Sequence, residues 1–464
     1  MYYENGTARE IKIAYIGGGS RGWAWNLMSD LALEPTVSGT VYLYDIDHEA
    51  ARQNAIIGND IRYHYPQYDN LTYVAAESAE EALTGADFVM ISILPGTFDE
   101  MESDVHTPEK YGIYQAVGDT VGLGGLVRAL RTLPIFEEYA KLIERYCPKA
   151  WVINYTNPMT VCTDMLYKTF PKIRAIGCCH EVFGTQEVLV DALCDIAGIE
   201  GVEHGDIKVD VIGINHFTWL TAATWRDIDV FPIYRAFCEK YQKTGHGREK
   251  AGQSWINKYF KCDQRVKFDL FLRYGYIAAA GDRHLAEFCP ASWYMKDPET
   301  VDSWGFSLTP VSWRRERARE LAARGERMAR REQRFDIYRS GELGVQQMKA
   351  VLGLGDLVTN VNLPNRGQIP NLPLGAVVET NAYFTSGSVV PMFAGEMPAP
   401  ILGLTERIVT NQQMLVEAVR TRDLSLAFEA FINDPQNTLD MPTSRKLFDE
   451  MLENTKRYLT MYEF

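Results

Sequence analysis

The 464-residue sequence has no uninterrupted apolar stretch approaching 18 residues, so no membrane-spanning helix is expected. Its first ten residues are polar and lack the apolar segment of a secretory signal, and we therefore expect a cytoplasmic protein. Only eight cysteines are present, without the spacing of a disulfide scaffold, which indicates free thiols in a reducing compartment. There is no internal repeat and no low-complexity linker.

Basic residues are also in deficit, with 47 lysines and arginines against 61 acidic residues and a net charge of −14. A chain this acidic repels phosphate backbones and anionic lipid, so nucleic acid and membrane surfaces are not expected as partners. The remaining composition, 46% hydrophobic and 23% charged, is that of an ordinary globular protein. The length suits two domains or one large one.

The first two hundred residues alternate short apolar runs with segments of helical periodicity, as in residues 128–147. Strands alternating with helices predict an α/β fold, with an N-terminal Rossmann-like, doubly wound parallel sheet over residues 1–205. The expected strands are residues 11–16, 41–44, 88–93, 151–153 and 173–176.

The pattern changes near residues 200–208, and we expect residues 206–464 to form a mixed α/β (α+β) domain that binds substrate and metal. Strands are predicted at 209–214 and 376–384. Residues 313–334 predict a long helix with nine arginines and four glutamates. A solvated helix with internal ion pairs is favoured there over a basic face for an anion or RNA.

A glycine-rich turn follows the first of these strands and precedes a helix. Gly17, Gly19 and Gly22 match the G-x-G-x-x-G fingerprint, with Ser20 inside the turn. Glycines there let backbone N–H groups approach a pyrophosphate at a helix N-terminus. Asp45 ends the next strand, 23 residues after Gly22, where a carboxylate accepts ribose hydroxyls and repels a 2′-phosphate. The sequence therefore predicts NAD binding.

Further polar clusters follow other strands, where ligands of parallel sheets collect. For several of these residues a purely structural role is the alternative to a functional one. Gly96 would allow close passage of the cofactor. Asp119 lies in a glycine-rich loop that is otherwise a flexible lid, and Asn154 precedes a turn that otherwise caps a helix. Cys179 and His216, each after a strand, suit half of a metal site, or Cys179 is a buried thiol.

Taken together, these stretches resemble glycoside hydrolase family 4 over most of the chain. The most specific motif is Cys179-His180-Glu181-Val182, which resembles the α-galacturonidase subgroup. The segments 213–219 and 281–288 also resemble that subgroup. Family 6-phospho-glycosidases instead carry Cys-Asp or Cys-Asn at this motif, and α-galactosidases carry Cys-His-Ser-Val.

The resemblance implies an NAD- and divalent-metal-dependent hydrolase of α-D-galacturonides. By matching motif, Cys179 and His216 would hold the metal, usually Mn²⁺, and Asn154 would bind substrate. Asp119 is a further candidate for substrate binding. Asp282 lies where related enzymes on non-phosphorylated sugars place their base. The implied reaction oxidises carbon 3 with NAD⁺, removes the carbon 2 proton, eliminates the group at carbon 1, adds water and returns the hydride.

Four roles are less defined by the resemblance. We expect Asp282 to be the base, with Tyr276 as runner-up, and His180 to be the acid because it can carry a proton near neutral pH. Glu181 is the competing acid or else orients a metal ligand. A uronate carboxylate needs a cation, and the expected partners are Arg283 first and His284 second. The alternative for residues 282–284 is a surface ion pair.

Rival functions remain at this point. Within the family these are α-glucuronidase, α-glucosidase and α-galactosidase activities. Outside it they are an NAD-dependent sugar-acid dehydrogenase, which would release NADH, and an NAD-sensing regulator. The expected substrate is a small oligogalacturonide or another α-galacturonoside. The resemblance also implies a homo-oligomer, either a dimer or a tetramer.

Overall fold

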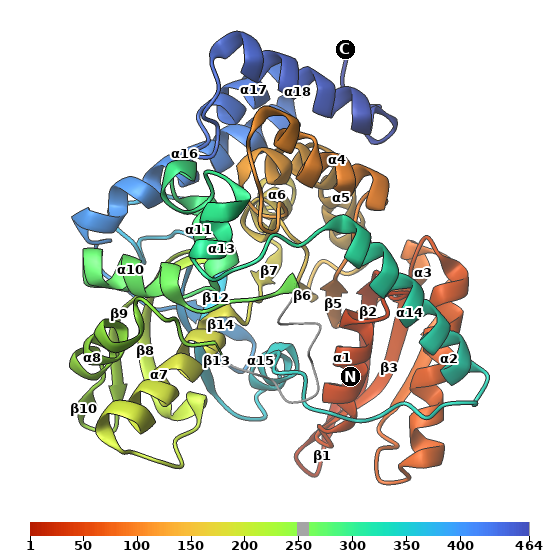
Figure 1. Cartoon of the computed structure of the whole chain (residues 1–464). Helices are drawn as coiled ribbons and strands as arrows, with labels where there is room; N and C mark the ends of the chain where they lie inside the picture. The colour runs from red at the N-terminus through yellow and green to blue at the C-terminus, as the bar shows by residue number, and fades with distance from the viewer. Residues whose placement is uncertain (248–258, 464) are drawn as a thin grey trace.

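A computed structural model describes residues 1–247 and 259–463 of the chain. Its main element is a ten-stranded sheet in the order β14-β13-β12-β7-β6-β5-β2-β3-β4, with β1 paired to β2 (Figure 1). The strands are β1 (Tyr2–Glu4), β2 (Thr7–Ile16), β3 (Val37–Tyr44), β4 (Leu71–Ala75), β5 (Phe88–Ile91), β6 (Trp151–Asn154), β7 (Arg174–Gly177), β12 (Leu357–Pro364), β13 (Val377–Thr385) and β14 (Ser388–Pro391).

The six strands from β2 to β7 are all parallel, which confirms the predicted Rossmann-like sheet. Across the sheet these strands stand in the order β4-β3-β2-β5-β6-β7, so that the first strand of the six along the chain, β2, lies in the middle. The order therefore reverses between β2 and β5, and dinucleotides bind at such a switch point, beyond the carboxyl ends of the strands.

Helices cover both faces of this sheet. One apolar core packs α5 (Gly122–Tyr146) and α6 (Met159–Thr169) together with the C-terminal helices α16 (Ala399–Thr421), α17 (Leu424–Ile432) and α18 (Met441–Thr455). The other core packs α1 (Trp23–Ala32), α2 (His48–His64) and α15 (Gly344–Val351). Two short helices, α3 (Ala79–Leu83) and α4 (Phe98–His106), complete the N-terminal half.

The second half of the chain adds antiparallel strands to this same sheet. β12 pairs with β7 through Asn362 and Gly177, and β13 and β14 follow. The predicted strand at 376–384 is β13. The expected boundary near residue 205 therefore does not separate this sheet from the second half, and the division into 1–205 and 206–464 stays a prediction.

A smaller antiparallel sheet holds β8 (Ile207–Ile214), β9 (Phe217–Trp225), β10 (Ile228–Asp229) and β11 (Ile277–Ala278). It lies beside α7 (Glu181–Ala197), α8 (Phe231–Tyr241) and α10 (Arg265–Tyr274), drawn in green and yellow in Figure 1. The short helices α11 (Asp282–Phe288), α12 (Ala291–Tyr294) and α13 (Pro298–Ser303) then lead to α14 (Val311–Ala329). Short 3₁₀ turns occur at η1 (Pro108–Tyr111), η2 (His204–Asp206) and η3 (Lys456–Tyr458).

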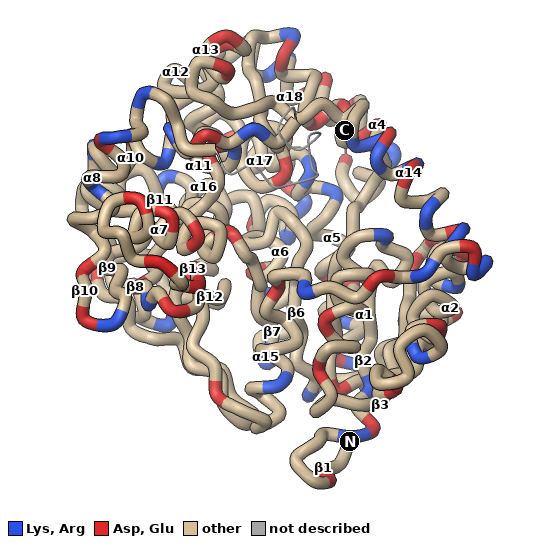
Figure 2. Tube along the Cα trace, turned by 60° about the horizontal axis from the view of Figure 1, so that its bottom comes forward, with Lys and Arg blue, Asp and Glu red and all other residues tan. Residues whose placement is uncertain are grey.

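The arginine-rich helix α14 ends five residues earlier than predicted, because Arg331 adopts a left-handed backbone conformation with φ 63°. Its cations alternate with acidic groups of its own and of α2 and α4 (Figure 2). Arg315 contacts Asp99 at 2.8 Å and Arg317 contacts Glu320 at 2.9 Å. In residues 1–247 and 259–463, no helix is both long and apolar enough to cross a bilayer.

Candidate active site

The turn between β2 and α1 has no room for side chains at its first glycines. A Cβ atom on Gly17, whose φ is +92°, would lie 1.9 Å from the carbonyl oxygen of Ser92. One on Gly18 would lie 2.7 Å from the Cα of Leu43. By contrast, a Cβ on Gly22 would meet nothing within 4 Å. Close packing thus explains Gly17 and Gly18, and Gly22 leaves the start of α1 open for a ligand.

Asp45 lies directly after β3 and touches the same turn. Its Oδ2 accepts a hydrogen bond from the Gly19 N–H at 2.9 Å, and its Oδ1 accepts one from the Asp47 N–H at 2.9 Å. Burial raises the pKa of Asp45, and the two backbone N–H groups oppose that rise. Ser20 accepts a bond from the Trp23 N–H at 3.2 Å. The structure therefore brings together the predicted residues from Gly17 to Asp45.

One buried side chain that the sequence reasoning missed holds this turn in place. Asn54, on α2, is 1% exposed and donates to the carbonyls of Gly18, at 2.8 Å, and Ser20, at 3.0 Å. Its Oδ1 accepts from the Trp25 indole N–H at 2.8 Å. The sequence carries one signal for this role: an asparagine on the alanine-rich, core-facing side of a helix. A buried amide there needs hydrogen-bond partners, which indicates a structural contact.

Two other predicted positions carry mainly structural contacts. Gly96 has φ +89° and follows β5, where Arg131 donates to the neighbouring Pro95 carbonyl at 3.1 Å. Arg131 also makes a buried ion pair with Asp104. Asn154, at the end of β6, is fully buried and its Oδ1 accepts from the Thr156 N–H at 2.9 Å. Their roles toward cofactor and substrate stay predictions.

Three polar side chains from distant segments form a group with metal-binding geometry. One ligand atom each of Asp119, His216 and His284 lies within 4.8 Å of the others. The two imidazole rings stack at 3.9 Å between centroids. Asp119 also accepts from the Asn157 amide at 3.4 Å, which ties the group to the turn at the carboxyl end of β6. We call these three side chains the metal group.

The charge states of the metal group suit a divalent cation. Burial, and then His284, lower the pKa of His216 to about 3, so its imidazole is neutral. Its Nδ1 lies 2.9 Å from the Thr120 hydroxyl. Burial opposes ionisation of Asp119, but the Arg128 guanidinium holds its pKa below the usual range. Neutral imidazoles with a carboxylate form a donor set that accommodates Mn²⁺ and related ions.

Cys179, the other predicted ligand, lies outside that group. Among the described residues its sulfur belongs to no set of three candidate ligand atoms within 4.8 Å. The thiol is 8% exposed, and burial raises its pKa well above the ordinary value. A metal would favour the thiolate, because a coordinating thiol loses its proton. Its role as a ligand stays a prediction.

A buried carboxylate lies behind Cys179, and the sequence reasoning did not single it out. Glu379, on β13, is 1% exposed and accepts from the Asn360 amide at 2.6 Å and the Thr218 hydroxyl at 3.1 Å. Asn360 also donates to the Cys179 carbonyl at 3.3 Å. Burial raises the pKa of Glu379. This network joins β13 and β12 to β9 at the base of the site.

Glu181 and His180 have distinct surroundings. Glu181 accepts from the Gly281 N–H at 2.7 Å and lies 3.9 Å from the Nε2 of His284. Burial would raise its pKa, but His284, His180 and His216 lower it to about 2. An ionised Glu181 suits orientation of His284 better than proton donation. His180 has a side chain 51% exposed, with Nδ1 2.7 Å from Glu342.

Among residues 1–247 and 259–463, no contact joins Asp282 or Tyr276 to the metal group. The Asp282 side chain is fully buried, its Oδ1 accepts from the Lys267 N–H at 3.1 Å, and burial raises its pKa to about 6. Tyr276 is half-buried against an apolar cluster. Arg283 donates to the Ala116 carbonyl at 3.1 Å, and burial lowers its pKa to about 10. The roles expected of these three residues stay predictions.

Comparison with known proteins decides the family. Residues 12–194 match the description "Family 4 glycosyl hydrolase", and residues 211–437 match "Family 4 glycosyl hydrolase C-terminal domain". The chain belongs to family 4 of the glycosyl hydrolases. The resemblance found in the sequence is therefore confirmed.

Several relatives of this family 4 chain are named alpha-galacturonidase. An alpha-galacturonidase of Thermoanaerobacterium saccharolyticum is 58% identical over 99% of this chain and 98% of that protein. An alpha-galacturonidase of Bacillus subtilis is 51% identical over 96% of this chain and 98% of that protein. A Bacillus subtilis alpha-galactosidase is 29% identical over 93% of this chain and 94% of that protein.

Solved structures confirm the fold. A Bacillus subtilis protein, assigned provisionally to the glucosidases in its description, has a TM-score of 0.91 and 50% identity, over 96% of this chain and 100% of that chain. A Thermotoga maritima 6-phospho-beta-glucosidase with manganese, NAD⁺ and glucose-6-phosphate has a TM-score of 0.77 at 20% identity, over 97% of this chain and 99% of that one.

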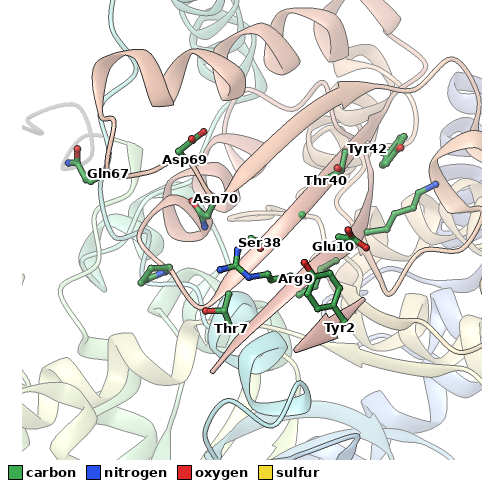
Figure 3. A pocket seen from close by; sticks show the side chains of 14 residues that line it. Tyr2, Thr7, Arg9, Glu10, Ser38, Thr40, Tyr42, Gln67, Asp69 and Asn70 are labelled. Carbon is green, nitrogen blue, oxygen red and sulfur yellow. The ribbon is translucent and has the colours of Figure 1, made fainter. Parts of the chain in front are cut away.

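One surface pocket of the family 4 chain lies away from this site. It is lined by residues of β1, β2 and β3 and the loop before β4, including Arg9, Ser38 and Asn70 (Figure 3). These residues lie toward the amino ends of β2, β3 and β4, whereas Gly17 and Asp45 follow the carboxyl ends. Because ligands of such sheets bind at the carboxyl ends, we do not assign catalysis to this pocket.

Proposed function

We propose that this family 4 enzyme is an α-galacturonidase that requires NAD and a divalent metal, Mn²⁺ in the first place. One observation carries the proposal: the metal group contacts the turn after β6, at the same edge of the parallel sheet as the glycine turn. The alpha-galacturonidase name of relatives at 51% to 58% identity supports the galacturonide substrate. The manganese and NAD⁺ in a protein of the same fold support the cofactors.

The glycine turn and Asp45 would hold the cofactor. Backbone N–H groups at the start of α1 offer donors to a pyrophosphate, and Gly22 leaves the space above them open. Each Asp45 oxygen keeps a lone pair beyond its backbone hydrogen bond, so the carboxylate can accept ribose hydroxyls. Its negative charge disfavours a 2′-phosphate, and NAD is therefore preferred over NADP.

The metal group, together with the predicted ligand Cys179, would hold the cation. When bound, NAD⁺ takes up and returns a hydride, and the metal acts as a Lewis acid on a sugar oxygen. His216 offers a neutral imidazole, and Asp119 offers an ionised carboxylate. Glu181 orients His284 through its 3.9 Å approach to Nε2.

We assign proton transfers to the predicted acid and base. His180 is exposed with its Nδ1 2.7 Å from Glu342, and we propose that its imidazole gives a proton to the leaving group. Asp282, with a pKa raised to about 6, suits a base that removes the carbon 2 proton. Tyr276 remains the second candidate for the base, and Asn154 a candidate for hydroxyl recognition.

The partners and location follow from composition and resemblance. We propose a small oligogalacturonide or α-galacturonoside as substrate, no nucleic-acid or membrane partner, and a cytoplasmic homo-oligomer, either a dimer or a tetramer. The acidic balance of the chain supports the first exclusion.

Hydrolysis of p-nitrophenyl α-D-galacturonide by the purified, reduced protein tests the function. The assay is run with and without NAD⁺ and Mn²⁺, beside the α-glucuronide and α-galactoside analogues. We expect cleavage of the galacturonide alone, dependent on both cofactors and without net NADH. Cleavage of another glycoside would overturn the substrate, and steady NADH formation without cleavage would indicate a dehydrogenase.

A further inference from the structure

Three arginines from separate helices lie within electrostatic range of the Asp119 carboxylate. Arg128 is on α5, Arg283 on α11 and Arg314 on α14, and each interacts electrostatically with Asp119. Burial lowers the pKa of Arg128, and the charge of Arg314 lowers it further. Three segments that are distant in sequence thus bring three positive charges into range of Asp119.

Arg128 is the most unusual of these side chains. It is 6% exposed, its Nε has no hydrogen-bond partner, and within residues 1–247 and 259–463 its guanidinium makes no hydrogen bond or ion pair. Arg131, one turn further along α5, pairs with Asp104 and the Pro95 carbonyl. A buried guanidinium without a partner is costly, so its retention indicates a group that arrives with a ligand.

Arg314 departs from the pattern of its own helix. Its neighbours on α14 make ion pairs with Asp99 and Glu320. Arg314 is half-buried, and in the described part of the chain it has no hydrogen bond or ion pair. It is therefore not one of the solvated, paired arginines that explain the rest of α14.

The local carboxylates do not balance the three cations. Asp119 belongs to the metal group. Glu287 accepts at Oε1 from the N–H groups of Val117, at 2.7 Å, and Gly118, at 2.9 Å, so it mainly holds the loop before Asp119. Arg283 already donates to the Ala116 carbonyl and lies over the Phe260 ring at 4.5 Å. Arg128 and Arg314 are left for an anion.

We propose that Arg128 and Arg314 together bind the carboxylate of the galacturonosyl unit and thereby determine specificity for uronides. The inference rests on the proposed function and deepens it. A galacturonide differs from a galactoside by the carboxylate on carbon 5, and planar guanidinium groups bind carboxylates bidentately. A neutral galactoside would leave the same guanidinium groups buried and unpaired, which penalises it. Arg283, the partner expected from adjacency, becomes secondary.

The variants Arg128→Gln and Arg314→Gln test this assignment. We measure kcat/KM for p-nitrophenyl α-D-galacturonide and for the α-D-galactoside, with NAD⁺ and Mn²⁺ present. The preference for galacturonide should fall by about 100-fold for Arg128→Gln and about 10-fold for Arg314→Gln, as the loss of a charge-assisted contact predicts. Arg319→Gln, at an exposed position of the same helix, should leave the preference within about twofold.

Binding of free D-galacturonate gives a second readout that does not need turnover. Its inhibition or dissociation constant should rise by similar factors in both variants, while the constant for NAD stays unchanged. Arg314→Lys, which keeps the charge, covers the case in which Arg128→Gln fails to fold, and it should recover part of the loss seen in Arg314→Gln.

Failure of the arginine assignment and failure of the proposed function give different results. Unchanged galacturonate binding in both folded variants, or weaker NAD binding with galacturonate binding intact, overturns the arginine assignment. A wild-type protein that cleaves no galacturonide instead overturns the proposed function. Galacturonate binding then still decides the arginine assignment.

Discussion

The cofactor turn and the metal group are built in opposite ways. The glycine turn is contiguous in sequence, and its polar groups find partners within the protein through Asp45 and Asn54. The metal group comes from three distant segments, and beside it the buried Arg128 has no hydrogen bond from its guanidinium within the described part of the chain. The polar groups of the turn are therefore satisfied within the folded chain, whereas the charges in and around the metal group need charged ligands to balance them.

The two regions therefore contribute differently to the stability of the fold. Close packing around Gly17 stabilises the fold and also shapes the cofactor site. Accumulated like charges around Asp119 destabilise the folded chain until a cation and a carboxylate bind. Changes in the turn should therefore affect both stability and NAD affinity, and changes in the metal group should affect metal-dependent catalysis while leaving NAD affinity unchanged.

The largest effect is expected for Asp119→Asn. The neutral amide is a weaker metal ligand, so Mn²⁺-dependent kcat/KM should fall by about a thousandfold or more. The dissociation constant for NAD should stay within about twofold, because Asp119 does not touch the glycine turn. Steady-state kinetics with Mn²⁺ titration, and NAD binding by calorimetry, measure the two quantities. Full Mn²⁺-dependent turnover in this variant would remove Asp119 from the metal group.

Cys179→Ser sharpens the definition of the metal site. We expect it to abolish metal-dependent turnover with NAD binding intact, since a hydroxyl replaces the thiolate that the family resemblance assigns as ligand. His284→Ala is the matched comparison, because the structure places His284 rather than Cys179 beside His216. Mn²⁺ affinity measured for both variants identifies the ligand. Full activity of Cys179→Ser would restrict the site to the three residues of the metal group.

A smaller and different effect is expected for Gly17→Ala. Its Cβ would collide with the Ser92 carbonyl at a positive φ, so the free energy of unfolding should fall by about 3 kcal/mol, with loss of NAD affinity. Gly22→Ala is the control for the stability measurement, because its Cβ meets no described atom within 4 Å. Urea unfolding and NAD titration provide the comparison. Equal stability of the two variants would contradict the packing explanation of the turn.

The smallest effect concerns Asp434, which links the loop after Asp119 to the C-terminal helices. Asp434 accepts from the Gly122 N–H at 3.2 Å, and burial raises its pKa to about 6. A raised folded pKa means that the stability contribution present below pH 4 is lost as pH rises through 6. Relative to Asp434→Asn, the wild-type free energy of unfolding should therefore fall by about 2 kcal/mol between pH 4 and 7. A difference independent of pH would refute this.

The sequence predicted the regions that depend on neighbouring residues. The parallel strands and the turn from Gly17 to Gly22 have local signals, namely buried apolar runs and a fixed glycine spacing. Asp45 followed from its distance to the turn. The position of β12 to β14 in the same sheet had no such signal, because antiparallel pairing of Asn362 with Gly177 depends on the whole fold.

The site was predicted residue by residue but not as an assembly. Asp119, His216 and His284 were each singled out, yet the stacking of the two rings and the carboxylate beside them arise from three segments that meet only after folding. Arg128 could not be distinguished from Arg131 in the sequence, since both lie on the core-facing side of α5. Only the partners in the structure separate a paired arginine from an unpaired one.

The two regions must act on one sugar if the account is correct, and hydrolysis in D₂O tests this most directly. Galacturonate released from the p-nitrophenyl substrate should carry one deuterium at carbon 2, keep the original hydrogen at carbon 3 and appear without net NADH. This result requires reversible oxidation at carbon 3 followed by proton removal at carbon 2. Product without deuterium at carbon 2 would show direct hydrolysis and contradict the account.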